Sequence, residues 1–433
     1  MSLDRALESH LAPLLWVLDV AVEDAEWKRL EPAMRRRRLL DGLSRLVLRE
    51  SQLQPLVLVF EDLHWIDGET QAFLDQLMES LPTARLLLLV NYRPEYRHDW
   101  GSKTYYRQLR IDPLSPASAD QLLGTLLGND PSIVAIMPML IARTEGNPFF
   151  LEESVQGLIE TEALAGERGA YRLMKSPETL TIPATVQNIL AARIDRLVPE
   201  DKRLLQAASV IGKDIPYPLL QALAEVDETA MRAGLARLQA AEFLYEVQLF
   251  PEAQYTFKHA LTHEVAYGGL LQGRRRALHA KVMEAIEARY PDRLAEQMSQ
   301  LAVHAMRGEV WAKALHYCRE VASKASDRRA YDESALAYEQ ALEALRHLPE
   351  SSDTARSAVE LRQSLAMILA NQSQYQRSVA LFDEAETLAR QLDDQAPMRD
   401  VLAVVSWTRR DMGDLDGAMA AASRSLEISD HDW

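Results

Sequence analysis

The sequence predicts a multidomain, mainly α-helical protein that begins with a partial α/β domain and ends in an α-solenoid of paired helices. Three observations lead to this prediction. Two all-apolar runs, at 56–60 and 86–90, flank a single amphipathic segment near the start of the chain. Apolar residues at helical spacing dominate the chain after residue 115. From residue 274 onward the chain is rich in Ala, and similar patterns recur.

The composition and net charge indicate which class of protein this is and which kinds of partner are not expected to bind it. A chain of 433 residues, 48% apolar and 26% charged, is expected to fold into roughly two to four globular domains. The formal net charge of -16 disfavours nucleic acid as a partner. The single cysteine, Cys318, excludes an intrachain disulfide and favours a reducing compartment, so we expect a cytoplasmic protein. Because the apolar runs are far shorter than the roughly 20 residues that cross a bilayer, we expect no membrane partner.

The first part of the chain, up to about residue 54, is predicted to be helical, and a strand, a helix and a second strand follow. The runs 56–60 and 86–90 contain only Val, Leu and Phe, which is typical of parallel strands that are buried on both faces. Between them, residues 69–80 have helical periodicity, and Asp67 is placed to cap that helix. Such a crossover is right-handed, and it brings both strand ends to one edge of the sheet.

Polar residues follow both predicted strands. Glu61 and Asp62 come directly after the first strand, and Asn91 and Arg93 come just after the second. Ligands of doubly wound sheets bind at this edge, so we expect the four side chains to converge on one site. The alternative is that the two acids merely end a strand.

Three motifs of the sequence resemble those of a known family. The segment LVFEDLHWID at 58–67 resembles the Walker B segment of the STAND class of AAA-related ATPases. These are the signal-transduction ATPases of MalT-like regulators and of multidomain class III adenylate cyclases. Residues 90–96 are similar to the sensor strand of that family, and residues 145–153 to its Gly-x-Pro lid motif. The motifs occur in the family's order, and with the C-terminal repeats the resemblance extends over nearly the whole chain.

The resemblance implies a catalytic set of Glu61, Asp62 and Arg93, and phosphoryl transfer to water as the reaction. By motif position, Glu61 would hold Mg²⁺ through a water molecule. Asp62 would orient the attacking water or a group behind it, because neighbouring strand residues point to opposite faces. Arg93 would stabilise the γ-phosphate.

The resemblance also implies ATP and Mg²⁺ as cofactors, with Asn91, Arg93, Gly146 and Pro148 as nucleotide-binding residues. Pro148 would pack on the adenine and couple the lid to the nucleotide. Asn91 departs from the family, which more often has a small hydroxyl residue at this position. Arg93 is therefore the firmer assignment at the second strand.

The sequence contains no phosphate loop of the form G-x-x-x-x-G-K-[ST]. Its only Gly-Lys pair, Gly212-Lys213, is followed by Asp214 and has Ala207 where the first Gly belongs, so we interpret it as a helix end. In the family the loop lies far upstream of Walker B. We therefore expect an upstream segment or a separate chain to supply it, and we expect no ATP hydrolysis by this chain alone.

A helical lid and a winged helix are expected next. A short strand at 109–111 would end the α/β core, and Ser115-Pro116 would begin the first lid helix. Helices up to residue 242, followed by strands at 243–247 and 254–257, favour a winged helix with a structural or autoinhibitory role. His259 and His263 lie one helical turn apart, but without further ligands they are interpreted as structural rather than zinc-binding.

The C-terminal part resembles divergent tetratricopeptide repeats. Tyr331, Tyr375 and Leu415 occupy equivalent positions, at intervals of 44 (375 minus 331) and 40 (415 minus 375) residues. Such an array is expected to bind a protein partner. No polar capping helix follows the last predicted helix, 415–428, which favours either a continuation of the chain or a homo-oligomer.

Together these features predict four domains. They are a partial AAA-type P-loop NTPase core without Walker A (1–112), a helical lid (113–180), a winged helix (181–272) and tetratricopeptide-like repeats (273–433). The predicted function is the regulatory part of a STAND-type ATPase, in which a nucleotide-dependent switch is coupled to a partner-binding module. The alternative is a non-catalytic interaction scaffold with a degenerate ATPase core.

Overall fold

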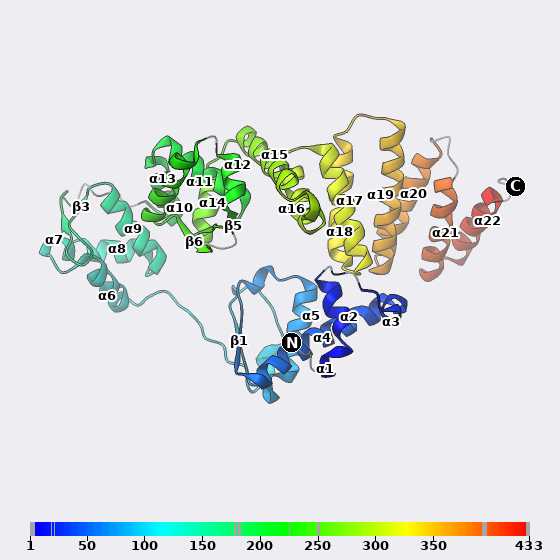
Figure 1. The fold of residues 1–433 in the computed structure, drawn as a ribbon, viewed down its shortest axis with the longest axis horizontal. Coiled ribbons are helices and arrows are strands. Elements are labelled where there is room, and N and C mark those ends of the chain that lie inside the picture. The colour runs from blue at the N-terminus through cyan, green and yellow to red at the C-terminus, as the bar shows by residue number, and fades with distance from the viewer. Residues whose placement is uncertain are drawn as a thin grey trace. The chain divides into compact units, whose positions relative to one another are not determined.

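The computed structural model describes residues 5–18, 20, 22–176, 180, 183–224, 226–248, 252–391 and 396–429. The described chain is mainly helical, with a few short sheets (Figure 1). It forms two compact units, one of residues 1–109 together with 318–433, and one of residues 110–317. The predicted boundary after residue 180 adjoins residues 181 and 182, which lie outside the described residues.

The N-terminal region contains the predicted helices followed by strand, helix and strand. Its elements are α1 (Arg5–Glu8), α2 (Leu11–Val17), α3 (Ala25–Arg29), α4 (Pro32–Leu53), β1 (Leu56–Phe60), α5 (Gly68–Ser80) and β2 (Leu86–Val90). Strands β1 and β2 are parallel, and Phe60 pairs with Val90 at their carboxyl ends. The Asp67 carboxylate caps α5 by accepting hydrogen bonds from the N–H groups of Glu69 and Thr70.

Among the described residues, only one face of this sheet is covered. Leu88 and Val90 on that face pack with Leu74 and Trp100. On the other face, the side chains of Val57, Val59, Leu87 and Leu89 are 47–58% exposed. The prediction that both strands are buried on both faces is therefore wrong for this sheet. The sheet has only two strands, and the apolar cluster that packs on it lies on one side.

The strand predicted at 109–111 is also absent. Leu109 and Ile111 lie in a segment without regular structure and are 88% and 95% exposed. Alternating apolar residues stay in a strand only when a sheet edge pairs with them, and this segment pairs with neither β1 nor β2.

The second unit begins with short helices around a common apolar core. These are α6 (Pro116–Leu127), α7 (Pro131–Val134), α8 (Met137–Thr144) and α9 (Pro148–Glu160), followed by the hairpin of β3 (Leu164–Ala165) and β4 (Arg172–Leu173). Ser115 caps α6 as predicted, because its hydroxyl accepts a hydrogen bond from the N–H of Ser118 at 3.2 Å. Leu123, Leu140 and Leu151 are fully buried in the core that these helices share.

Helices and a three-stranded antiparallel sheet follow. They are α10 (Val186–Arg196), α11 (Pro199–Ile211), β5 (Asp214–Pro216), α12 (Tyr217–Leu223), α13 (Glu228–Ala240), β6 (Leu244–Gln248), β7 (Gln254–Phe257) and α14 (Ala260–Gly268). The strand order is β5-β7-β6. Gly212 follows α11 with φ 138, so the Gly212-Lys213 pair ends a helix, as predicted.

The C-terminal region is a succession of antiparallel helices (Figure 1). They are α15 (Gln272–Arg289), α16 (Leu294–Arg307), α17 (Trp311–Asp327), α18 (Tyr331–Arg346), α19 (Ser352–Asn371), α20 (Tyr375–Ala389), α21 (Ala396–Asp411) and α22 (Leu415–Ser429). The three residues predicted to be equivalent, Tyr331, Tyr375 and Leu415, each begin a helix.

The repeats also share contacts between side chain and backbone. The buried hydroxyl of Ser334 donates to the carbonyl of Ala322 at 2.8 Å, and the buried hydroxyl of Ser378 donates to the carbonyl of Ala366 at 2.7 Å. Each serine is the fourth residue of its helix, and each carbonyl lies 12 residues earlier in the preceding helix. The same contact therefore fixes the second helix of two successive pairs.

Candidate functional site

The strand ends place Asp62 and Asn91 in direct contact. The N–H of Asp62 donates to the side-chain oxygen of Asn91 at 2.7 Å. Backbone bonds continue the pairing beyond the strands, because the N–H of Asn91 donates to the carbonyl of Phe60 and the N–H of Leu63 donates to the carbonyl of Asn91. The segment after β1 is thus held against the segment after β2, at the sheet edge where the sequence predicts the site.

Asp62 has a left-handed backbone, with φ 57 and ψ 43. This conformation costs an ordinary residue about 1–2 kcal/mol, and Asp and Asn are the non-glycine residues that adopt it most readily. The hydrogen bond that the side-chain oxygen of Asn91 accepts from the N–H of Asp62 stabilises the turn at the point where the backbone turns away from β1. The amide that departs from the family pattern therefore has a structural role in this chain.

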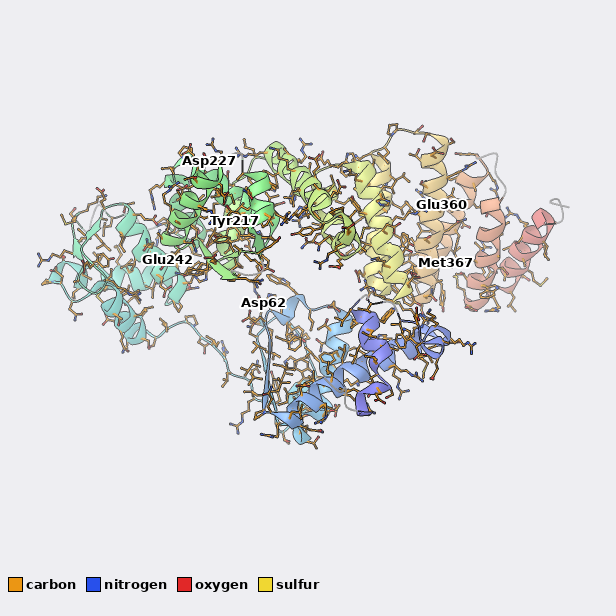
Figure 2. The ribbon with its side chains drawn as sticks, in the orientation of Figure 1. Asp62, Tyr217, Asp227, Glu242, Glu360 and Met367 are labelled. Atoms are coloured by element: carbon orange, nitrogen blue, oxygen red, sulfur yellow. The ribbon has the colours of Figure 1, made fainter. Side chains whose placement is uncertain are left out.

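Both acidic side chains at the end of β1 are exposed (Asp62 is labelled in Figure 2). Among the described residues, no hydrogen bond or ion pair reaches the carboxylate of Glu61 or of Asp62. Mg²⁺ in nucleotide sites takes one or two carboxylates together with waters and phosphate oxygens. The two free carboxylates fit that partial donor set. No cluster of three or more His, Cys, Asp or Glu side chains suited to a metal ion occurs in the part of the chain that the structure describes.

Arg93 lies beside an exposed aromatic ring. Its guanidinium carbon is 5.7 Å from the centre of the Trp65 ring, and Trp65 is 66% exposed. A cation over an exposed ring gains about 0.5–1 kcal/mol. Within the described residues no carboxylate lies within 4 Å of Arg93, so its charge is available to an anion.

Gly146 and Pro148 belong to the unit of residues 110–317, whereas the strand-end residues belong to the other unit. Gly146 has φ 73, and a Cβ there would lie 2.3 Å from the carbonyl oxygen of Leu114. The side chain of Asn147 caps α9 by accepting from the N–H of Phe150 at 3.1 Å, and Pro148 is the first residue of that helix. Both residues of the lid motif therefore have local structural reasons to be there.

The two histidines of α14 and its cap differ in their surroundings. His263 has a structural partner, because its Nε2 lies 2.9 Å from the carbonyl oxygen of Ser209. His259 has a buried Nε2 that meets no hydrogen-bond partner among the described residues. Its ring centre is 4.0 Å from that of Phe149, beside the lid motif. Burial, and then the charge of Lys258, lower the pKa of His259, so its ring is neutral at pH 7.

The interpretation of His259 as purely structural thus missed an unpartnered nitrogen next to the lid. The sequence signal that could have found it is its position, directly after β7 and before the first turn of α14. A polar residue between a strand and a helix is more often exposed to a ligand than one inside either element.

No family model matches the chain. An uncharacterized protein of Rhizobium meliloti (strain 1021) is 26% identical over 309 residues, which cover 70% of this chain and 29% of that protein. The chain thus spans less than a third of the length of this relative. Among solved structures, the chain is similar to a Signal Transduction ATPase with Numerous Domains (STAND) with a tetratricopeptide repeat sensor, from Pyrococcus horikoshii. Identity is 11% and the TM-score is 0.44, with 98% of this chain and 68% of the other covered.

The helices of the described residues include none with the length and apolar content needed to cross a bilayer.

Proposed function

We propose that this chain is the regulatory part of a STAND-type signal-transduction ATPase, in which a nucleotide-dependent switch is coupled to a protein-binding repeat array. The observation that carries the proposal is the geometry at the ends of β1 and β2. There the bond from the N–H of Asp62 to Asn91 ties the two strand ends together, and within the described residues neither the carboxylates of Glu61 and Asp62 nor the guanidinium of Arg93 has an ionic partner. We also propose that the protein acts in the cytoplasm.

In the complete site, each of these residues has a separate task. Glu61 holds Mg²⁺ through water, and Asp62 orients the attacking water or a group behind it. Arg93 places its charge on the γ-phosphate, where negative charge must be stabilised in the transition state. Asn91 fixes the Asp62 turn and with it the position of the acids. Bound MgATP supplies the phosphoryl group that is transferred.

The lid and the domains that follow it convert occupancy into a signal. Pro148, at the start of α9, packs on the adenine, and Gly146 lets the chain pass close to residue 114. Residues 181–272 act as a winged helix with a structural or autoinhibitory role. The helix pairs of 273–433 bind a protein partner, as stacked repeats do through their extended surfaces.

The bare face of the β1–β2 sheet supports the expectation that this core is completed by further polypeptide. Parallel sheets occur almost only with both faces covered, and isolated two-stranded sheets are marginal. Four half-exposed Val and Leu side chains depart from that rule. We propose that an upstream segment, or a second chain, supplies both the cover and the phosphate loop, and that the chain alone does not turn over ATP.

The test compares this chain with a form extended at its N-terminus by the sequence encoded upstream. For the chain alone, we expect a dissociation constant for MgATP no better than millimolar, and no effect of Arg93→Ala. For the extended form, we expect micromolar binding, and ATP hydrolysis that is abolished by Glu61→Ala or Arg93→Ala. Glu95→Ala and Arg107→Ala, which remove one exposed acid and one exposed arginine that have no assigned role, are the matched controls.

Two results would contradict the proposal. One is micromolar, Mg²⁺-dependent binding of ATP by the chain alone that Glu61→Ala removes, because the missing loop would then be unnecessary. The other is an extended form that binds no nucleotide. In that case the chain is a non-catalytic interaction scaffold with a degenerate ATPase core.

A further inference from the structure

A groove in the unit of residues 110–317 has no role in the nucleotide switch. Its volume is about 320 Å³, and it runs between the last turn of α11, helix α14 and one stripe of α16. The α16 stripe advances by one helical turn at a time and includes Val303, His304 and Arg307. Small-molecule sites usually have volumes of about 300–1,000 Å³, so this groove has the size for a compact ligand.

Arg307 is the only lining side chain of the groove that is charged at neutral pH. The lining contains no carboxylate, and Glu264, beside the groove residue His263, is exposed and does not line it. Arg307 is exposed, and its guanidinium carbon lies 6.0 Å from the centre of the Tyr267 ring. No described carboxylate lies within 4 Å of Arg307. In a chain of net charge -16, this groove therefore presents an unpaired positive charge.

The histidines of the groove are neutral, so they add hydrogen-bonding atoms but no charge. Burial, followed by the charge of Arg307, lowers the pKa of His304 to about 4. Burial is also the largest cause that lowers the pKa of His263. His263 already uses its Nε2 on the carbonyl of Ser209, which fixes the ring against the end of α11.

A buried network holds the walls of the groove in place. The Tyr267 hydroxyl lies 2.8 Å from Nε2 of His279, and Nδ1 of His279 lies 2.9 Å from Nδ1 of His304. Helices α14 and α16 are thus connected through α15. Arg275 packs on the Tyr267 ring, with its guanidinium carbon 4.4 Å from the ring centre. The groove is therefore preformed, which favours specific binding because little order has to be gained.

The last turn of α11, which also lines the groove, offers acceptors rather than charge. Val210 and Ile211 form the last turn of α11, and within the described residues their carbonyl groups accept no hydrogen bond. Carbonyls at a helix C-terminus are suited to a ligand donor such as a hydroxyl or an amine. The side chains of Ile211, Val303 and Tyr267 add apolar surface to the lining of the groove.

We propose that this groove binds a small organic carboxylate that carries a hydroxyl or amino group at its opposite end. The carboxylate pairs with Arg307, the apolar body lies along Val303 and Tyr267, and the donor reaches the carbonyls at the end of α11. The proposal is independent of nucleotide binding, because none of these residues belongs to the site at β1 and β2.

The experiment measures binding by titration calorimetry on the full 433-residue chain. The probes are 4-hydroxybenzoate, 4-hydroxyphenylacetate and 4-aminobenzoate, each paired with the corresponding primary amide, which has no negative charge. We expect at least one acid to bind with a millimolar or lower dissociation constant, and its amide to bind at least about tenfold more weakly. Tenfold is a modest expectation for the loss of a charge-assisted hydrogen bond.

Three variants locate the site. Arg307→Gln should weaken binding of the acid at least about tenfold, whereas Arg274→Gln, which removes an exposed arginine of α15 outside the groove, should leave it within about twofold. Val303→Trp keeps the charge of Arg307 but places a large ring in the groove, so it should abolish binding by steric exclusion. The proposal is overturned if no acid binds, if acid and amide bind equally, or if Arg307→Gln and Arg274→Gln have the same effect.

Discussion

Replacing Arg193 with methionine should severely loosen the connection between α9 and the helices that follow. The Arg193 side chain is 1% exposed, and one of its N–H groups donates to the carboxylate of Glu153, which is 5% exposed. Its Nε donates to Glu160 at 2.7 Å, and its Nη2 donates to the carbonyl of Ala241 at 2.9 Å. The guanidinium carbon also lies 4.7 Å from the centre of the Phe243 ring.

The size of the destabilisation depends on which partners of Arg193 lose their hydrogen bonds in the Arg193→Met variant. Glu153 would remain buried without its partner, and breaking a buried pair in this way costs about 3–5 kcal/mol. Glu160 adds little, because it is 23% exposed and keeps a second partner, Arg196, at 3.1 Å. Burial already raises the pKa of Glu153 in spite of the neighbouring arginine. The double variant Arg193→Met/Glu153→Gln should therefore be less destabilised than Arg193→Met alone, because no buried charge remains.

The assay must be local, since a multidomain chain does not unfold in two states. Hydrogen exchange of peptides from α9 and α10 should accelerate strongly in Arg193→Met and less in the double variant. The matched control is Arg196→Met, which removes an arginine that is 38% exposed and pairs with the same Glu160. It should cost at most about 1 kcal/mol. The reasoning fails if Arg193→Met and Arg196→Met have equal effects, or if the double variant exchanges faster than Arg193→Met.

Two further predictions concern a glycine and a pair of histidines. Gly146→Ala should destabilise its unit by about 2 kcal/mol, because φ is 73 and the new Cβ would lie 2.3 Å from the carbonyl oxygen of Leu114. Hydrogen exchange of α9 peptides should therefore accelerate in Gly146→Ala, whereas Gly68→Ala, where nothing lies within 4 Å, should leave exchange of α5 unchanged. Burial lowers the pKa of His279 to about 3 and of His304 to about 4. Below about pH 6.5 the unfolded chain binds more protons than the folded chain, so stability should fall by about 1.4 kcal/mol per pH unit for each histidine. Hydrogen-exchange protection of peptides from α14, α15 and α16, corrected for the intrinsic pH dependence of exchange, should show this slope between pH 7 and pH 4.5. His304→Gln should flatten the slope, and protection that does not change with pH would contradict the prediction.

Local features of the structure followed directly from the sequence. Asp67 caps α5, and Tyr331 and Tyr375 begin the helices that the repeat pattern predicts. Each of these features depends on a residue and its neighbours within a few positions. The apolar runs likewise identify β1 and β2, and the single helix between them requires the two strands to be parallel.

The errors concern contacts between segments that are distant in sequence. The run 56–60 has the composition of a fully covered strand, but whether its second face is covered depends on neighbours that the run itself does not specify. The segment 109–111 alternates like a strand and finds no sheet edge. The composition of a segment indicates which secondary structure it can form. Whether a strand pairs with a neighbour, and whether both of its faces are buried, depends on the rest of the fold.

The candidate site shows the same limit at the level of single residues. Asn91 was identified as a departure from the family pattern, but its bond to the N–H of Asp62 depends on the register of two strands. Arg193 gave no signal at all, because an arginine in an amphipathic helix is usually exposed. Its burial requires three acceptors from two separate segments, α9 and the end of α13, which only the fold brings together.

These contacts limit how the proposed lid would transmit a signal within the unit of residues 110–317. Helix α9 contacts the segments that follow it through the rings of Phe149 and His259, through the buried pair of Glu153 and Arg193, and through Glu160, which pairs with Arg193 and Arg196. A displacement of Pro148 by a nucleotide would therefore either move α9 together with α10–α14, or break a buried ion pair at a cost of about 3–5 kcal/mol. Ligand-driven shifts are usually about 1–3 kcal/mol, which is less than that cost. The lid and the three-stranded domain should therefore move as one body, with any hinge lying outside them.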